Sequence, residues 1–215
     1  MSSAVTIVLL DANILYARTL RDWIGLLQGE VPALFTVVWT EDVMVETLYH
    51  LRKKYPLWSE EQIGGLRRKL EKAFTGGQIT GYQIDASLEY PDIGDAHLHA
   101  AAVHGAVDIV VTRNGKDLPY GDDLPYEIYE PDDFLILVDD AAPQAVRAVT
   151  ESQLCYFHKK SSPDEGIDLP LRLNKAGAPK FAARVRDHLQ HVDMSILTRK
   201  EDAETPDGDV VSVRG

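Results

Sequence analysis

Four acidic residues, far apart in the chain, have the side chains that metal-assisted hydrolysis of a phosphodiester requires. They are Asp11, Glu46, Asp95 and Asp117. Mg²⁺ and Mn²⁺ prefer hard oxygen ligands such as carboxylates, and they keep bound waters that can act as nucleophiles. The set therefore predicts a divalent-metal site, provided that the fold brings the four side chains together.

The elements that must position these carboxylates alternate between strands and helices. Residues 5–10 and 107–112 are apolar, largely β-branched runs, which are typical of buried parallel strands. Weaker strands are predicted at residues 34–39, 79–84 and 126–129. Helices are predicted from Ala12 until Gly29, then at residues 41–55, 60–74, 96–104, from Pro131, and at 145–159 and 179–190.

This order predicts an α/β fold with three layers, α/β/α, around a mainly parallel central sheet. The compact domain is expected over residues 1–140, followed by a helical C-terminal extension over 141–198 and a flexible acidic tail over 199–215. In such a sheet the carboxyl ends of the strands meet in one crevice, so Asp11, Asp95 and Asp117 are expected to share it. Glu46 joins them only if its helix crosses the same edge.

The overall charge argues against a broad nucleic-acid-binding face. The chain has 215 residues, with 22 Lys and Arg against 34 Asp and Glu, which gives a net charge of −12. Such a chain repels nucleic acid on average, although a local basic patch or a metal-neutralised acidic site remains compatible with it. The basic stretch at residues 67–72 is either a solvated helix face or a contact to an RNA backbone.

The cysteine and histidine residues limit the kinds of metal site and disulfide that the chain can form. Cys155 is the single cysteine, which excludes an intramolecular disulfide and argues against a cysteine-based zinc site. His97 and His104 lie seven residues apart on one helical face, and we interpret them as packed or exposed rather than metal-binding.

The apolar run at residues 5–10 is too short for a membrane span, and we expect a cytoplasmic protein.

Blocks at residues 10–15, 45–48, 95–102 and 111–118 together resemble the PIN domain. The blocks include Leu10-Asp11-Ala12-Asn13, Asp95-Ala96-His97-Leu98 and Thr112-Arg113-Asn114-Gly115-Lys116-Asp117. The closest likeness is to VapC-type ribonuclease toxins of bacterial toxin–antitoxin pairs. The segment 173–183 also resembles the helical C-terminal extension of one VapC subgroup.

The resemblance implies endonucleolytic cleavage of RNA that depends on Mg²⁺ or Mn²⁺. It implies an acidic set of Asp11, Glu46, Asp95 and Asp117, with Asn13, Thr112 and Asn114 as supporting polar residues. Asn114 competes with Asp117 for the last position of this set. The resemblance further implies a cognate antitoxin as partner and, since PIN domains often pair, a homodimer.

One position departs from the pattern of the resemblance. Members of the subgroup often carry an acidic residue directly before the equivalent of Asp95, whereas this chain has Gly94. Asp92 lies close enough in sequence to replace the missing charge, or to cap the helix that follows. A non-catalytic PIN-like scaffold that binds RNA or protein is therefore an alternative function.

Each acidic residue also has a structural interpretation. Asp11 and Asp95 both stand where helix N-caps occur, and Asp117 lies in a turn whose amides it could satisfy. A further alternative is a phosphatase of the haloacid-dehalogenase type, because Asp11 follows a strand and residues 121–123 are Gly-Asp-Asp. Against it, Asn13 stands where that family expects a second aspartate.

Overall fold

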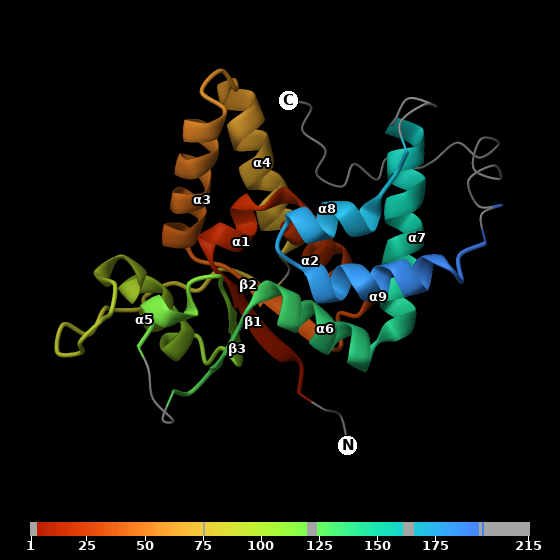
Figure 1. Cartoon of the computed structure of the whole chain (residues 1–215). Coiled ribbons are helices and arrows are strands. Elements are labelled where there is room, and N and C mark those ends of the chain that lie inside the picture. The colour runs from red at the N-terminus through yellow and green to blue at the C-terminus, as the bar shows by residue number, and fades with distance from the viewer. Residues whose placement is uncertain (1–3, 75, 120–123, 161–165, 194, 196–215) are drawn as a thin grey trace.

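A parallel sheet of four strands forms the centre of the fold (Figure 1). The computed structural model describes residues 4–74, 76–119, 124–160, 166–193 and 195. The strands are β1 (Thr6–Leu10), β2 (Phe35–Val38), β3 (Ile109–Val111) and β4 (Glu127–Tyr129), in the order β2-β1-β3-β4. The predicted α/β class with a parallel sheet is confirmed.

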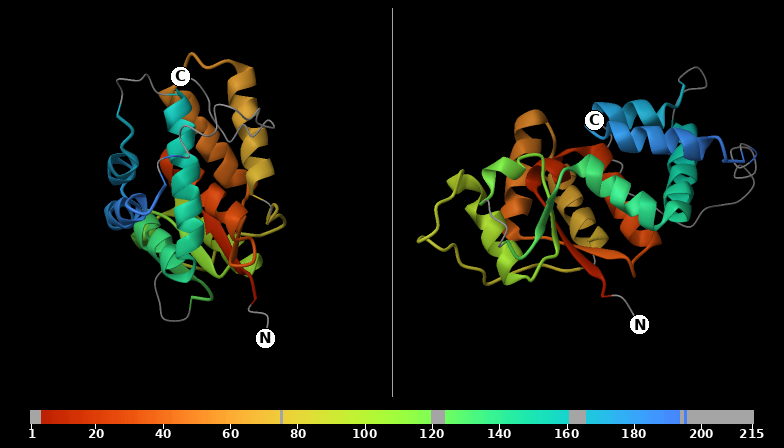
Figure 2. Two further views of the ribbon diagram at one scale, coloured as in Figure 1. Left: turned by 90° about the vertical axis from the view of Figure 1, so that its right-hand side faces the viewer. Right: turned by 60° about the horizontal axis from the view of Figure 1, so that its bottom comes forward.

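Helices flank this sheet (Figures 1 and 2). They are α1 (Ala12–Tyr16), α2 (Arg18–Glu30), α3 (Glu41–Lys54), α4 (Glu60–Ala73), α5 (Ala96–His104), α6 (Pro131–Ala141), α7 (Pro143–Lys160), α8 (Leu169–Lys175) and α9 (Pro179–Leu189). Two short 3-10 turns, η1 (Ile93–Asp95) and η2 (Gly115–Asp117), lie near the carboxyl edge. No helix in the described part of the chain is long and apolar enough to span a membrane.

The two central strands are the ones with the strongest sequence signal. Leu10 pairs with Val111 and Val8 with Ile109, and both strands are almost fully buried toward their carboxyl ends. Burial on both faces explains why these strands are continuous apolar runs rather than alternating patterns. The ends of β1 and β3 are therefore held side by side.

The predicted strand at residues 79–84 is wrong. Only an isolated bridge between Trp39 and Gln78 forms, and the segment after it consists of bends and exposed positions. Gly81 has a φ of +80°, in the left-handed region that glycine tolerates, so the extended backbone cannot continue through it. The segment becomes a loop that leads toward η1.

The single helix predicted from Ala12 until Gly29 is two helices. The backbone turns extended at Ala17, with φ of −76° and ψ of 93°, although no glycine or proline stands there. The break lets α1 pack against α3 while α2 packs against α7 and α8. Tertiary contacts thus override a continuous helical periodicity.

The C-terminal helices share one hydrophobic core with the sheet domain. Phe181 of α9 is fully buried, and its ring meets that of Trp23 on α2 edge to face, with centroids 5.2 Å apart. The predicted helices at 145–159 and 179–190 are confirmed, with small shifts at their ends. Helix α8 begins after Asp168, whose side chain accepts a hydrogen bond from the amide of Leu171, and the pattern did not predict its start. The tail at 199–215 lies outside the described residues.

Helix α9 is capped by a side chain from another helix. Its own N-cap residue, Ala178, has no side chain for the purpose, and the carboxylate of Asp132 on α6 accepts hydrogen bonds from the amides of Lys180 at 3.0 Å and Phe181 at 2.9 Å. Asp132 is 7% exposed. A buried carboxylate at a helix N-terminus satisfies two amides that lack partners in the helix, so this contact fixes α9 on α6.

Replacing Asp132 by alanine is expected to lower the free energy of unfolding by about 2–3 kcal/mol, because two buried amides lose a charged acceptor. Urea denaturation measures this loss. Asp133→Ala is the matched control: the Asp133 carboxylate forms only an exposed ion pair with Lys180, and its loss is expected to cost less than about 1 kcal/mol. Equal losses in the two variants would contradict the capping role.

Candidate active site

A buried network joins the carboxyl ends of β1 and β3. Asp11, 4% exposed, accepts hydrogen bonds on Oδ2 from Thr112 Oγ1 and from Asn13 Nδ2, both at 2.5 Å. Asn13 Nδ2 also donates to Thr112 Oγ1 at 3.2 Å. We call Asp11, Asn13 and Thr112 the Asp11 network. It fixes the orientation of a carboxylate at the centre of the sheet edge.

The Asp11 network also shapes the loop after β3. The amide of Arg113 donates to Asn13 Oδ1 at 3.3 Å, and the amide of Asn114 donates to Thr112 Oγ1 at 2.9 Å. The side chain of Asn114 itself is exposed. Thus Asn13 and Thr112 contact Asp11 directly, whereas Asn114 lies on the outer side of the loop.

Burial dominates the electrostatics of Asp11. It raises the pKa of the carboxyl group, and the hydrogen bond from Thr112 only partly offsets this effect. Asp11 occupies the N-cap position of α1, where its side chain makes no capping hydrogen bond, although the amides of Ala12 and Asn13 also lower its pKa. The contacts with the Thr112 and Asn13 side chains thus account for its orientation better than capping does.

Asp95 lies at the centre of the acidic residues. It precedes α5 and makes no capping hydrogen bond. Its pKa is raised to about 6, first by burial and then by the negative charges of four other carboxylates, which belong to Asp11, Asp92, Glu46 and Asp117. We call these five residues the acidic cluster. Effects of this kind require that the four carboxylates lie within electrostatic range of Asp95, so the fold brings the predicted acidic residues into one region of the sheet edge.

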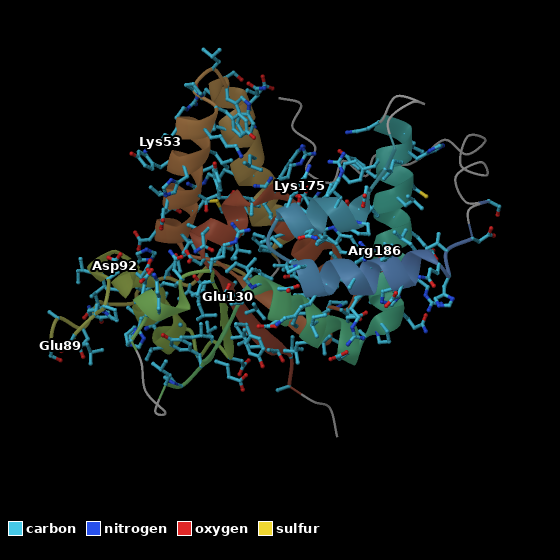
Figure 3. The ribbon with its side chains drawn as sticks, in the orientation of Figure 1. Lys53, Glu89, Asp92, Glu130, Lys175 and Arg186 are labelled. Atoms are coloured by element: carbon cyan, nitrogen blue, oxygen red, sulfur yellow. The ribbon has the colours of Figure 1, made fainter. Side chains whose placement is uncertain are left out.

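Asp92 and Asp117 meet on the outer side of the acidic cluster. The side chain of Asp92 accepts a hydrogen bond from the amide of Gly94 at 2.8 Å and so caps η1. The backbone amide of Asp92 donates to the carbonyl oxygen of Asp117 at 3.3 Å, which ties η1 to η2. Asp92 and the neighbouring Glu89 project from the segment before α5 (Figure 3). Capping accounts for Asp92 without a catalytic role.

Glu46 reaches the acidic cluster because α3 begins directly after β2. Thr40 caps α3 by accepting a hydrogen bond from the amide of Val43 at 3.1 Å, as the sequence predicted. The Glu46 carboxylate lies 3.8 Å from Nε2 of His97 and 3.5 Å from Nε2 of His50. Its pKa is lowered, chiefly by the nearby His97 imidazole, so Glu46 stays ionised near neutral pH.

His97 is the residue of this region that sequence reasoning missed. The Glu46 carboxylate raises the pKa of His97, whose Nδ1 is buried and has no hydrogen-bond partner in the described part of the chain. The one available signal was its position two residues after Asp95. His97 lies 3.8 Å from the Glu46 carboxylate and so contributes a partner charge on the edge of the acidic cluster.

The acidic cluster suits a hard divalent cation by its chemistry. In the residues that the structure describes, no group of three or more His, Cys, Asp or Glu side chains converges tightly enough to hold a metal ion. Carboxylates without a counter-ion repel one another, and this repulsion adds to burial in raising the pKa of Asp95. All donors are carboxylate oxygens, which Mg²⁺ and Mn²⁺ prefer, so the donor chemistry suits such a cation although the side chains are not arranged as a closed metal site.

Comparison with protein families agrees with this arrangement. A family model described as PIN domain matches residues 7–116, about half of the chain, and the chain belongs to the PIN domain family. No curated protein and no solved structure matches the chain. PIN domains are typically nucleases that use Mg²⁺ or Mn²⁺, so family membership implies a nucleic-acid substrate and suggests nuclease activity. The match contains Asp11, Glu46 and Asp95 and ends one residue before Asp117.

The repulsion within the acidic cluster predicts a pH-dependent gain of stability in Asp95→Asn. The pKa of Asp95 rises from 3.8 to about 6 on folding, so the metal-free folded state binds more protons than the unfolded state between these values. Asp95 therefore lowers stability as the pH rises through this window. In EDTA the variant is expected to gain about 1 kcal/mol at pH 7, allowing for solvent screening.

Urea denaturation of the two proteins at pH 7 and near pH 4 measures this difference. At the lower pH the gain is expected to shrink to a small fraction of its value at pH 7, because the folded wild-type carboxyl group is then protonated and the unfolded one is only partly ionised. A gain of the same size at both pH values would mean that packing, and not charge, stabilises the variant.

Proposed function

We propose that this protein is a Mg²⁺- or Mn²⁺-dependent endoribonuclease and the toxin of a type II toxin–antitoxin pair of the VapBC kind. The observation that carries the proposal is the position of Asp11 and Asp95 at the carboxyl edge of the parallel sheet of a PIN domain, where burial and the charges of four other carboxylates raise the pKa of Asp95 to about 6. A PIN domain with such a site is suited to hydrolysing a phosphodiester.

In this proposal the four predicted acidic residues hold the cation. They are Asp11, Glu46, Asp95 and Asp117. When bound, the cation supplies a water of lowered pKa and neutralises charge that develops on the phosphate. For the last position we favour Asp117 over Asn114, because the charge of Asp117 contributes to the raised pKa of Asp95, whereas the described contact of Asn114 with Thr112 is made by its backbone amide.

Contacts within the chain orient the proposed metal ligands before a cation binds. The hydrogen bonds from Asn13 and Thr112 hold the Asp11 carboxylate in one orientation, and His97 holds Glu46 in its ionised form. A ligand that is already oriented loses little conformational entropy when the cation binds. Asp92 supports the site by capping η1 and so places Asp95 at the start of α5.

Asp95→Asn is expected to keep the fold but to lose RNA cleavage by at least about a hundredfold, because a neutral amide binds a divalent cation poorly. Gel-based cleavage of structured RNA and calorimetric titration with Mn²⁺ measure the two effects. Asp85→Asn removes a charge from an exposed carboxylate elsewhere and is expected to leave both unchanged.

Full activity of Asp95→Asn on nuclease-free protein would overturn the site assignment. Absence of carboxylate-dependent Mn²⁺ binding in the wild type would favour the alternative, a non-catalytic scaffold. No observation favours the haloacid-dehalogenase alternative, and its late acidic motif at residues 121–123 lies outside the described residues.

The toxin assignment rests on the likeness of the sequence blocks and of the segment 173–183 to VapC proteins. Expression of the chain alone is expected to arrest growth, and co-expression with the product of the adjacent reading frame is expected to relieve the arrest and to yield a co-purifying complex. Asp95→Asn should co-purify equally well without arresting growth. Arrest by this variant would separate toxicity from the carboxylate site. Homodimerisation and a cytoplasmic location stay predictions.

A further inference from the structure

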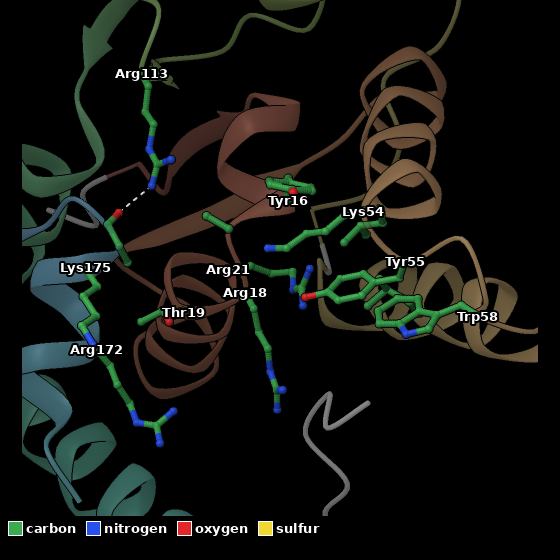
Figure 4. A pocket seen from close by; sticks show the side chains of 14 residues that line it. Tyr16, Arg18, Thr19, Arg21, Lys54, Tyr55, Trp58, Arg113, Arg172 and Lys175 are labelled. Atoms are coloured by element: carbon green, nitrogen blue, oxygen red, sulfur yellow. Dashed lines mark hydrogen bonds between the residues drawn. The ribbon is translucent and has the colours of Figure 1, made fainter. Parts of the chain in front are cut away.

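A basic cavity lies beside the acidic site. It has a volume of about 430 Å³ and is enclosed by the start of α2, the ends of α3 and α8, and the loop after β3 (Figure 4). Six cationic side chains line it, and none of its described lining residues is Asp or Glu. They are Arg18, Arg21, Lys54, Arg113, Arg172 and Lys175. In a chain of net charge −12, this is a strong local concentration of positive charge.

Most of this charge is not neutralised. Arg18 and Arg21 share Asp22, with nitrogen–oxygen distances of 3.4 and 3.5 Å. The other four cations form no ion pair within the described residues; they are Lys54, Arg113, Arg172 and Lys175. Unpaired like charges around one cavity repel each other, so an anionic ligand would be strongly favoured there.

Neutral groups hold these cations in place. Arg113 Nη2 donates to the carbonyl oxygen of Ala176 at 2.5 Å, and the guanidinium of Arg172 lies 4.3 Å from the ring centroid of Phe157. Lys54 Nζ lies 5.0 Å from the ring centroid of Tyr16. These three side chains are therefore ordered while they keep their charge, so little conformational entropy would be lost when an anion binds to them.

The cavity also has an aromatic wall. The rings of Tyr55 and Trp58 stack with centroids 4.4 Å apart and an interplanar angle of 4°. Both residues are partly exposed and face the cavity beside Lys54 (Figure 4). Each ring covers one face of the other, so only an outer face of the pair is open to a base. Cations next to partly exposed aromatic side chains are a combination that binds single-stranded nucleic acid, through phosphates and stacked bases.

One residue links the cavity to the acidic site. Arg113 lines the cavity, stands between Thr112 and Asn114, and donates its amide to Asn13 of the Asp11 network. An RNA strand that runs from the acidic cluster along the loop after β3 would therefore lead toward the cavity. The other basic segment, at residues 67–72, is less available, because Arg67 forms ion pairs with Glu41 and Glu71.

We infer that the basic cavity binds the phosphates and a stacked base of single-stranded RNA next to the scissile phosphate, and that α8 supplies one of its walls. This inference rests on the proposed function, since it names where that substrate is held. It also gives the C-terminal extension a role: Arg172 and Lys175 of α8 face Lys54 across the cavity (Figure 4). An acidic polypeptide would use the cations but not the aromatic wall.

Binding of a short fluorescein-labelled single-stranded RNA to the full chain in EDTA, measured by fluorescence anisotropy, tests the inference without cleavage. Lys54→Gln combined with Lys175→Gln removes one charge from each side of the cavity. Affinity is expected to fall about tenfold or more, and the slope of log K against log salt to become shallower by about 1.4, because two phosphate contacts are lost.

Lys53→Gln combined with Lys72→Gln is the matched control. Both lysines are exposed and lie in the last turns of α3 and α4, and Lys53 projects from the side of α3 that faces away from α8 (Figure 3). This pair carries the same charge change and is expected to alter affinity less than about twofold. Equal losses in the two double variants would overturn the inference, since charge alone would then explain binding.

Two further measurements distinguish RNA from an acidic peptide as the ligand, and distinguish this inference from the proposed function. Trp58→Leu is expected to weaken RNA binding at least about fivefold, because stacking is lost. If polyglutamate of equal charge competes as well as RNA does, and Trp58→Leu binds RNA normally, the cavity is an acidic-peptide site and the inference falls. Cavity-dependent RNA binding by a protein that never cleaves RNA would support the inference and overturn the proposed function.

Discussion

The structure depends on a buried carboxylate held between the ends of two central strands. Asp11 is 4% exposed, and burial alone would disfavour its charge. Hydrogen bonds from Thr112 and Asn13 compensate in part, and the same two side chains hold the backbone of the loop after β3. One network thus joins β1 and β3, starts α1 and sets the path of the chain toward Asp117. A substitution in the Asp11 network would therefore also alter the loop after β3 and the site residues that this loop positions.

Around this network the molecule separates its charges. In the acidic cluster, burial and the charges of four other carboxylates together raise the pKa of Asp95 to about 6. The basic cavity gathers six cations without a single acidic lining residue in the described part of the chain. The two regions meet at Arg113, whose amide bonds to Asn13 and whose guanidinium bonds to Ala176. The net charge of −12 includes both the acidic cluster and the basic cavity, so it does not describe the local charge of either region.

The C-terminal helices connect stability with the site. Phe181 of α9 packs on Trp23 of α2, and Asp132 of α6 caps α9, so the extension is fixed to the sheet domain by apolar and polar contacts together. This attachment brings the end of α8 to the loop after β3 and the end of α3. Bringing like charges together in each region lowers the free energy of unfolding. The extensive core shared by the sheet and the C-terminal helices can compensate for this loss.

The sequence by itself determined the elements whose signals are local. The apolar runs of β1 and β3, the Thr40 cap, the capping box of Ser59 with Gln62, and the acidic residues at the strand ends all follow from patterns within a few residues. Only the tertiary structure decided the break at Ala17, the loss of a strand at 79–84, the contact between His97 and Glu46, and the basic cavity. The break at Ala17, the contact between His97 and Glu46 and the basic cavity depend on packing between segments that are distant in the chain, and such contacts leave no periodic or local trace in the sequence. The strand pattern at 79–84 fails for a local reason, the left-handed backbone at Gly81, which a glycine permits but does not by itself announce.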